Sequence, residues 1–144
     1  EEDYYLLTQY VKDNNIENIT FTGFLQREKA IEYIDDADVL VLPNSAKDKM
    51  SFYTSPLKLF EYMAAKRVIV ASDLPSLREV LTDKENAILF EPDNANDLAE
   101  KLKYAIDVDT TSMVEKSSKD VLDYTWEQRA KNIKRFMEDI IDEK

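Results

Sequence analysis

The sequence predicts an α/β fold, in which a parallel β-sheet is flanked by helices. Short apolar runs alternate along the chain with segments of helical periodicity, which is the pattern of successive β-α units. The run at residues 38–42 is apolar after Asp38 until Pro43 stops it, as expected of a strand covered on both faces. The chain has 144 residues, of which 44% are apolar, and is long enough to bury a core of its own.

Four strands are expected, at residues 19–22, 38–42, 68–71 and 87–90. Helices are expected over residues 4–14, 28–34 and 56–66, from 75 onward, and from a cap at Asn96 to about 106. After residue 107 the composition changes, and a short linker leads to a helix ending near 124 and a last helix from Thr125. We therefore expect an α/β domain over residues 1–107 and a C-terminal helical extension over residues 108–144.

The last predicted helix is amphipathic. Its apolar residues fall on one stripe, which consists of Trp126, Ala130, Ile133, Met137 and Ile140. The sequence leaves two alternatives open for this stripe. It packs either on the domain's own sheet or against a partner outside this chain.

The composition excludes several function classes. The formal net charge of −11 disfavours nucleic acids and anionic membrane surfaces as partners. No apolar run approaches the roughly 20 residues that a membrane-spanning helix needs. The chain has no cysteine, which fits a reducing, cytoplasmic location and leaves no thiolate metal site. It also lacks histidine, so any chemistry must use carboxylates, lysines, backbone amides or the substrate, and we expect neither a metal nor a cofactor.

Glycine is nearly absent, which excludes two common nucleotide-binding motifs. The single glycine is Gly23, so the chain contains neither the G-x-G-x-x-G turn of dinucleotide-binding domains nor a P-loop. A phosphate-accepting receiver domain needs an aspartate at the end of a strand, whereas the strand at 38–42 runs into Pro43 and Asn44. We set that class aside as well.

The segment from Ser55 to Ala64 predicts an anion site at a helix N-terminus. Ser55 is a favourable N-cap, and Pro56 suits the first helical position. The backbone amides of Leu57 and Lys58 would then point out of the positive end of the helix, where a phosphate binds readily.

Two charged side chains in this segment have alternative interpretations. Lys58 in the first turn opposes the helix dipole by roughly 0.3–1 kcal/mol, a cost that a bound phosphate would offset. Glu61 shares a helix face with Leu57 and Ala64 and is placed to accept hydrogen bonds from two ribose hydroxyls. Alternatively, Lys58 and Glu61 pair with each other, or Glu61 is a solvated helix carboxylate. The spacing leaves these interpretations open.

Residues 61–65 (Glu-Tyr-Met-Ala-Ala) and 68–75 (Val-Ile-Val-Ala-Ser-Asp-Leu-Pro) resemble the second half of the E-x7-E motif of family 4 retaining glycosyltransferases, which have the GT-B fold. Further similar segments lie in the family's order at 21–24, 37–43, 85–90 and 126–130. The resemblance implies a Rossmann-like parallel sheet flanked by helices, as in the C-terminal half of a GT-B enzyme, with the first two strands missing. Either the strand at 19–22 then pairs beside the strand at 38–42, or a sheet edge stays open, through which we expect a tendency to form homodimers.

The resemblance also implies roles for individual residues. Glu61 corresponds to the glutamate that binds the donor ribose, and Leu57 and Lys58 correspond to positions whose backbone amides contact the donor diphosphate. Phe24 and Leu25 correspond to a turn that borders the nucleobase, although both side chains would also suit a core. No residue is assigned a catalytic role.

The sequence departs from the family pattern at several positions. Tyr53 stands where the family has the first glutamate of E-x7-E, which helps to orient the donor sugar. Ser55 belongs to the expected donor-binding set, but Pro56 replaces a glycine and removes one amide from it. Lys66, Leu74, Ser76 and Ala87 stand at positions that often carry glycine, so several tight turns must be built differently.

By this resemblance, the chain is expected to bind a UDP- or GDP-linked sugar for transfer of a hexose to a saccharide or lipid-linked acceptor, without a metal. The acceptor-binding half and two basic residues that contact the donor phosphates would lie outside this chain, so we expect no turnover from it alone. The alternative is a non-catalytic nucleotide-binding or interaction module with the same fold.

Overall fold

The computed structural model describes residues 2–47 and 57–142. The chain divides into two compact units, Glu1–Glu32 and Tyr33–Lys144, and each is described by itself.

The first unit contains helix α1 (Glu2–Asp13), and helix α2 (Arg27–Asp36) begins near its end. α1 is followed by Asn15, whose positive φ of 51° is a conformation that asparagine tolerates better than most residues. The rings of Tyr4 and Phe21 meet edge to face with their centroids 5.7 Å apart, which ties the segment after the helix back to α1.

The prediction of a strand at residues 19–22 is wrong, because this part of the described chain has no regular secondary structure. A strand is stabilised by hydrogen bonds to a neighbouring strand. No strand of the described residues pairs with this segment. The apolar and β-branched residues of this segment therefore have no neighbouring strand in the described sheet, and Ile19 is 47% exposed.

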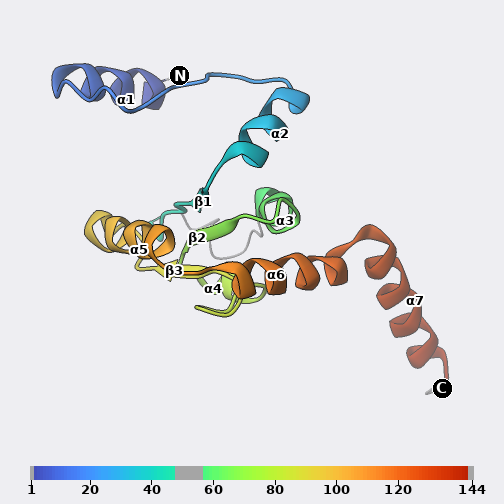
Figure 1. Cartoon of the computed structure of the whole chain (residues 1–144). Helices are drawn as coiled ribbons and strands as arrows, with labels where there is room; N and C mark the ends of the chain where they lie inside the picture. Colours follow the sequence, from blue (N-terminus) through green and yellow to red (C-terminus); the bar gives the residue numbers. More distant parts are fainter. Residues whose placement is uncertain (1, 48–56, 143–144) are drawn as a thin grey trace. The chain divides into compact units, whose positions relative to one another are not determined.

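The second unit is built on a three-stranded parallel sheet (Figure 1). Its strands are β1 (Val39–Leu42), β2 (Val68–Ser72) and β3 (Ile88–Phe90), in the order β1-β2-β3. The register places Val39 beside Val68 and Val70 beside Ile88. The α/β fold with a parallel sheet is confirmed, and three of the four predicted strands agree with the structure to within one residue.

β1 is less buried than β2. Its residues alternate between half-buried and buried, whereas all five positions of β2 are buried. Both faces of β1 are covered as predicted, because Leu42 belongs to one apolar cluster and Val39 packs against another on the opposite face. Its lower burial fits its place at an edge of the described sheet, where it pairs with β2 alone.

Helices connect and follow the strands. They are α3 (Leu57–Ala64), α4 (Pro75–Arg78), α5 (Ala95–Asp107), α6 (Thr111–Asp120), the 3-10 turn η2 (Val121–Tyr124) and α7 (Trp126–Asp142). The cap of α5 is Asn94, whose side-chain oxygen accepts hydrogen bonds from the amides of Asn96 and Asp97. The predicted cap at Asn96 is therefore wrong, because the helix already begins at Ala95 and Asn96 lies in its first turn.

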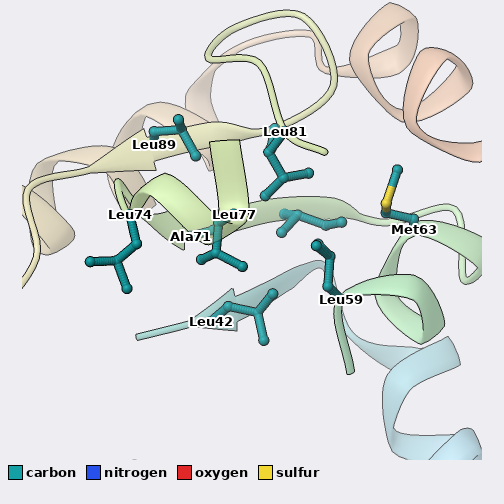
Figure 2. Close-up of a cluster of buried hydrophobic side chains, with 10 residues drawn as sticks. Leu42, Leu59, Met63, Ala71, Leu74, Leu77, Leu81 and Leu89 are labelled. Carbon is teal, nitrogen blue, oxygen red and sulfur yellow. The ribbon is translucent and has the colours of Figure 1, made fainter. Parts of the chain in front are cut away.

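Two apolar clusters cover the two faces of the sheet. The first joins α3 and the segment around α4 to all three strands (Figure 2), and consists of Leu42, Leu59, Met63, Ile69, Ala71, Leu74, Leu77, Leu81, Ala87 and Leu89. The second joins the strands to α5 and α6, and consists of Val68, Val70, Ile88, Phe90, Ala105 and Met113. Because successive residues of β2 alternate between the clusters, α3 and α5 cover opposite faces.

The apolar stripe of α7 is not buried on this sheet. α7 packs against η2, and Trp126, Ile133 and Met137 remain 77%, 52% and 57% exposed. Packing on the domain's own sheet is therefore wrong as an interpretation of the stripe. In the part of the chain that the structure describes, no helix has the length and apolar character needed to cross a membrane.

Candidate functional site

The first turns of α3 present three of the predicted donor-binding residues to solvent. Leu59 and Met63, one helical turn apart, are fully buried and fix the inner face of the helix. Leu57 is 76% exposed, and the side chains of Lys58 and Glu61 are exposed as well. Two predicted donor-binding residues, Tyr53 and Ser55, lie outside the described residues, as does Pro56.

Lys58 and Glu61 share the outer side of α3, but within the described residues no ion pair joins them. The interpretation of these two residues as a simple pair therefore has no support in the structure. Glu61 is also exposed rather than partly buried, so its oxygens are accessible to a ligand. The outward placement brings an amide-rich helix end, a cation and a hydroxyl acceptor to one surface.

Tyr62 is the residue of α3 whose ionisation is perturbed. Burial, and to a lesser extent the neighbouring Glu61 carboxylate, raise the pKa of the Tyr62 phenol above its ordinary value. The phenol thus stays protonated at neutral pH. No local sequence signal marks Tyr62, because its partial burial depends on how α3 packs.

Polar groups follow the carboxyl ends of the strands, which form one edge of a parallel sheet. The backbone N–H of Ala46, after β1, donates to Oδ2 of Asp93, after β3, at 3.1 Å. After β2, the Arg78 guanidinium binds both carboxylate oxygens of Asp73, with Nη2 at 2.6 Å from Oδ2. These hydrogen bonds hold the pKa of the Asp73 carboxyl below its usual range. The topology also brings α3 to this edge, because a helix that leads into a parallel strand begins on the carboxyl side of the sheet.

The turn predicted to border the nucleobase belongs to the first unit. Gly23 has a φ of 63°, a conformation that glycine adopts without strain. Phe24 is 97% exposed and Leu25 is half-buried, so Phe24 is not a core residue of this unit. The proposed nucleobase turn and α3 fall in different units, and their joint role stays a prediction.

Sequence reasoning missed two long-range contacts near this site. Ala46 bonds to Asp93 across 47 positions of sequence, and Phe60 on α3 meets Tyr124 of η2 with ring centroids 5.2 Å apart. No local signal predicts either contact, because each joins loops or helices that only the folded sheet brings together. In the described ranges 2–47 and 57–142, no cluster of acidic side chains is arranged to hold a metal ion.

Residues 2–107 of the chain match the protein family described as Glycosyl transferases group 1. The chain is also 22% identical over 141 residues to an uncharacterized glycosyltransferase of Methanocaldococcus jannaschii. That alignment covers 96% of this chain and 38% of the archaeal protein.

Solved structures show the same fold. One is the C-terminal domain of a group 1 family glycosyl transferase from Francisella tularensis, with a TM-score of 0.69 and 24% identity over 84% of this chain and 61% of that chain. Another is HepE from Anabaena in complex with UDP-glucose, with a TM-score of 0.69 and 20% identity over 84% of this chain and 32% of that chain. The chain thus spans less than two thirds of the length of each of these relatives.

Proposed function

This chain belongs to the group 1 glycosyltransferases and has the fold of their C-terminal domain, and on that premise we propose that it binds the diphosphate and ribose of a sugar donor at the first turns of α3. The observation that carries the proposal is that the side chains of Lys58 and Glu61 are both exposed at that end of the helix. Within the described residues, no ion pair joins the two side chains. In the proposed complex, the amides of Leu57 and Lys58 donate to phosphate oxygens, and the Glu61 carboxylate accepts from ribose hydroxyls.

The proposed donor is a nucleoside-diphosphate hexose, linked to UDP or GDP. The structure of Anabaena HepE, which has the same fold, contains UDP-glucose, and this supports a UDP-linked donor. The proposed reaction is transfer of the hexose to a saccharide or lipid-linked acceptor, with the helix end stabilising the diphosphate as it leaves. Because this chain spans 38% of its archaeal relative, we expect it to bind the donor without catalysing transfer by itself.

A nucleotide titration followed by NMR tests the proposal. UDP and GDP are added in turn to the 144-residue chain, and the amide resonances of α3 are compared with those of α5. We expect one nucleotide to shift the amides of Leu57 and Lys58, and Glu61→Ala to weaken binding about 10-fold or more, because hydrogen bonds to a charged group contribute about 1.5–3 kcal/mol.

Glu100→Ala is the matched control, since it removes the same charge from an exposed position on α5. It should leave the affinity within about twofold, as screened charges away from a site contribute little. Equal weakening by the two variants, or no shift of α3 amides with either nucleotide, would contradict the donor site.

One observation favours a second function, that of a non-catalytic interaction module. The apolar stripe of α7 is exposed over most of its length, as expected of a helix face that binds another protein surface. The two functions differ in the same titration. An interaction module without a ligand would show no nucleotide-dependent shift on α3.

A further inference from the structure

The helix that carries the proposed donor contacts is short and depends on its neighbours for its position. α3 has eight residues, fewer than an isolated helix needs to be stable in water. Leu59 and Met63 anchor its inner face in the first apolar cluster. These two anchors lie on the side of α3 opposite Lys58 and Glu61. The rotation of the helix about its axis therefore depends also on contacts made outside this inner face.

The C-terminal segment supplies that second support. Both α6 and η2 pack against α3. The Phe60 ring lies 5.2 Å from the Tyr124 ring, measured between centroids, with 33° between the ring planes. Val121, at the start of η2, packs against the first apolar cluster, which includes the anchors of α3. η2 thus meets α3 in two places: Tyr124 contacts Phe60 on the flank of α3, and Val121 packs against the cluster that buries the inner face of α3.

Tyr124 also reaches a second element. Its hydroxyl donates to the backbone carbonyl oxygen of Glu79, the residue after α4, at 3.5 Å. α4 contributes Leu77 to the same cluster as α3. The Tyr124 side chain therefore touches α3 with its ring and the end of α4 with its hydroxyl.

Phe60 is the residue next to Glu61, so the ring contact acts one position from the proposed ribose acceptor. Adjacent residues of an α-helix differ by about 100° around its axis, since there are about 3.6 residues per turn. A contact at Phe60 therefore limits rotation of α3 about its axis, and this rotation would swing the Glu61 carboxylate. Resting on the proposed function, we propose that Tyr124 is a positioning residue that fixes the orientation of α3 and, through it, of Glu61.

The chain offers a closely matched control for this contact. Tyr104 on α5 is 42% exposed and Tyr124 is 44% exposed, so replacing either removes a ring of similar exposure. Tyr104 lies on the element that covers the opposite face of the sheet from α3. The test compares Tyr124→Ala with Tyr104→Ala, and adds Tyr124→Phe, which keeps the ring, and Tyr124→Leu, which keeps apolar volume without a ring.

Two measurements are made on each variant of the 144-residue chain. Amide hydrogen exchange of α3 and α5 reports local opening, and UDP and GDP titrations report the proposed site. We expect Tyr124→Ala to speed exchange in α3 by about 2- to 12-fold, the range that corresponds to an aromatic pair, with α5 unchanged. Nucleotide affinity should fall in the same variant, whereas Tyr124→Phe should restore both to near wild-type values.

Each outcome decides a separate point. Unchanged exchange in α3 for both Tyr124→Ala and Tyr124→Leu would overturn the proposal, as would an equal effect of Tyr104→Ala. Faster amide exchange in α3 with undiminished nucleotide affinity would show that Tyr124 only supports the structure, and would also overturn the proposal. If the unmodified chain binds neither nucleotide, the proposed function fails and the role of Tyr124 in aiming Glu61 falls with it, while the exchange rates still decide whether Tyr124 holds α3.

Discussion

Four residues other than glycine adopt a positive φ in the described part of the chain: Asn15, Lys66, Lys84 and Asp93. Asparagine and aspartate tolerate this conformation, because their short polar side chains hydrogen-bond locally. Lysine has no such compensation. Lys66 follows α3, at a position where the family often has glycine, and the structure shows that its turn keeps the left-handed geometry with a side chain in place.

Lys66→Gly should raise the free energy of unfolding by up to about 1 kcal/mol, because glycine adopts a positive φ without steric cost. Urea denaturation measures the change. The matched control is Lys103→Gly, in the interior of α5, which should lower the free energy of unfolding by about 0.5–1 kcal/mol. Loss of stability in both variants would show that the turn at Lys66 is not strained.

The Asp73–Arg78 pair gives a pH dependence with a defined sign. The folded-state pKa of Asp73 is lowered from 3.8, mainly by the hydrogen bond from Arg78. A lowered pKa means that the stabilisation is fully present above the unfolded value and is lost as the pH falls through the folded value. Asp73→Asn should therefore lower the thermal midpoint at pH 7, and its difference from wild type should shrink as the pH falls from the unfolded pKa through the folded one.

Thermal unfolding at a series of pH values checks this prediction. A difference between Asp73→Asn and wild type that stays constant from neutral to strongly acidic pH would show that ionisation of Asp73 contributes nothing to stability.

At the scale of single elements, the N-terminus of α5 separates the predicted cap from the observed one. Asn94→Ala should lower the free energy of unfolding by about 0.5–2 kcal/mol, because two amides lose their acceptor. Asn96→Ala should have almost no effect, since Asn96 donates through its backbone, which the substitution keeps. Denaturant titration of the two variants decides between the assignments, and a larger loss at Asn96 would favour the sequence prediction.

The elements show which parts of the fold the sequence determines locally. Helical periodicity and apolar runs predicted the three paired strands, because each of them is buried by elements of the same unit. Residues 19–22 have the same kind of local signal and yet form no strand, because strand formation also needs a neighbour that no local pattern specifies. Whether the strand at 38–42 has a second neighbour is left open by the sequence for the same reason.

The candidate site divides in the same way. The exposed positions of Leu57, Lys58 and Glu61 follow from the helix that the sequence predicts around them. The contacts from Tyr124 to Phe60 and from Asp93 to Ala46 join distant segments, so no spacing in the sequence could have predicted them.

At the scale of the whole molecule, the exposed stripe of α7 predicts self-association at high concentration. Ile133→Glu should keep the chain monomeric, because a charge on the stripe must be desolvated when the stripe is covered. Gln128→Glu, which adds the same charge to α7 away from the stripe, is the control. Light scattering coupled to size-exclusion chromatography measures the mass across a concentration series.

Trp126 is the single tryptophan of the chain, so its fluorescence reports on α7 directly. At low concentration its emission should be that of a solvent-exposed indole, in accord with its 77% exposure, and it should shift to shorter wavelength as the chain associates. Association that Ile133→Glu does not reduce would direct attention to the open edge of β1, where a second copy of the chain would add a strand.

The in-order arrangement of the sheet has a consequence for how the second unit folds. Each strand pairs with the strand that is its neighbour in sequence, β1 with β2 and β2 with β3. In the described sheet no pairing has to wait for a more distant strand, so each pairing closes a single crossover connection, whose entropic cost grows only slowly with its length. The sheet can therefore grow one strand at a time in the direction of synthesis, whereas α3 gains its full cover only when Leu89 of β3 and the η2 turn have joined the cluster that buries it.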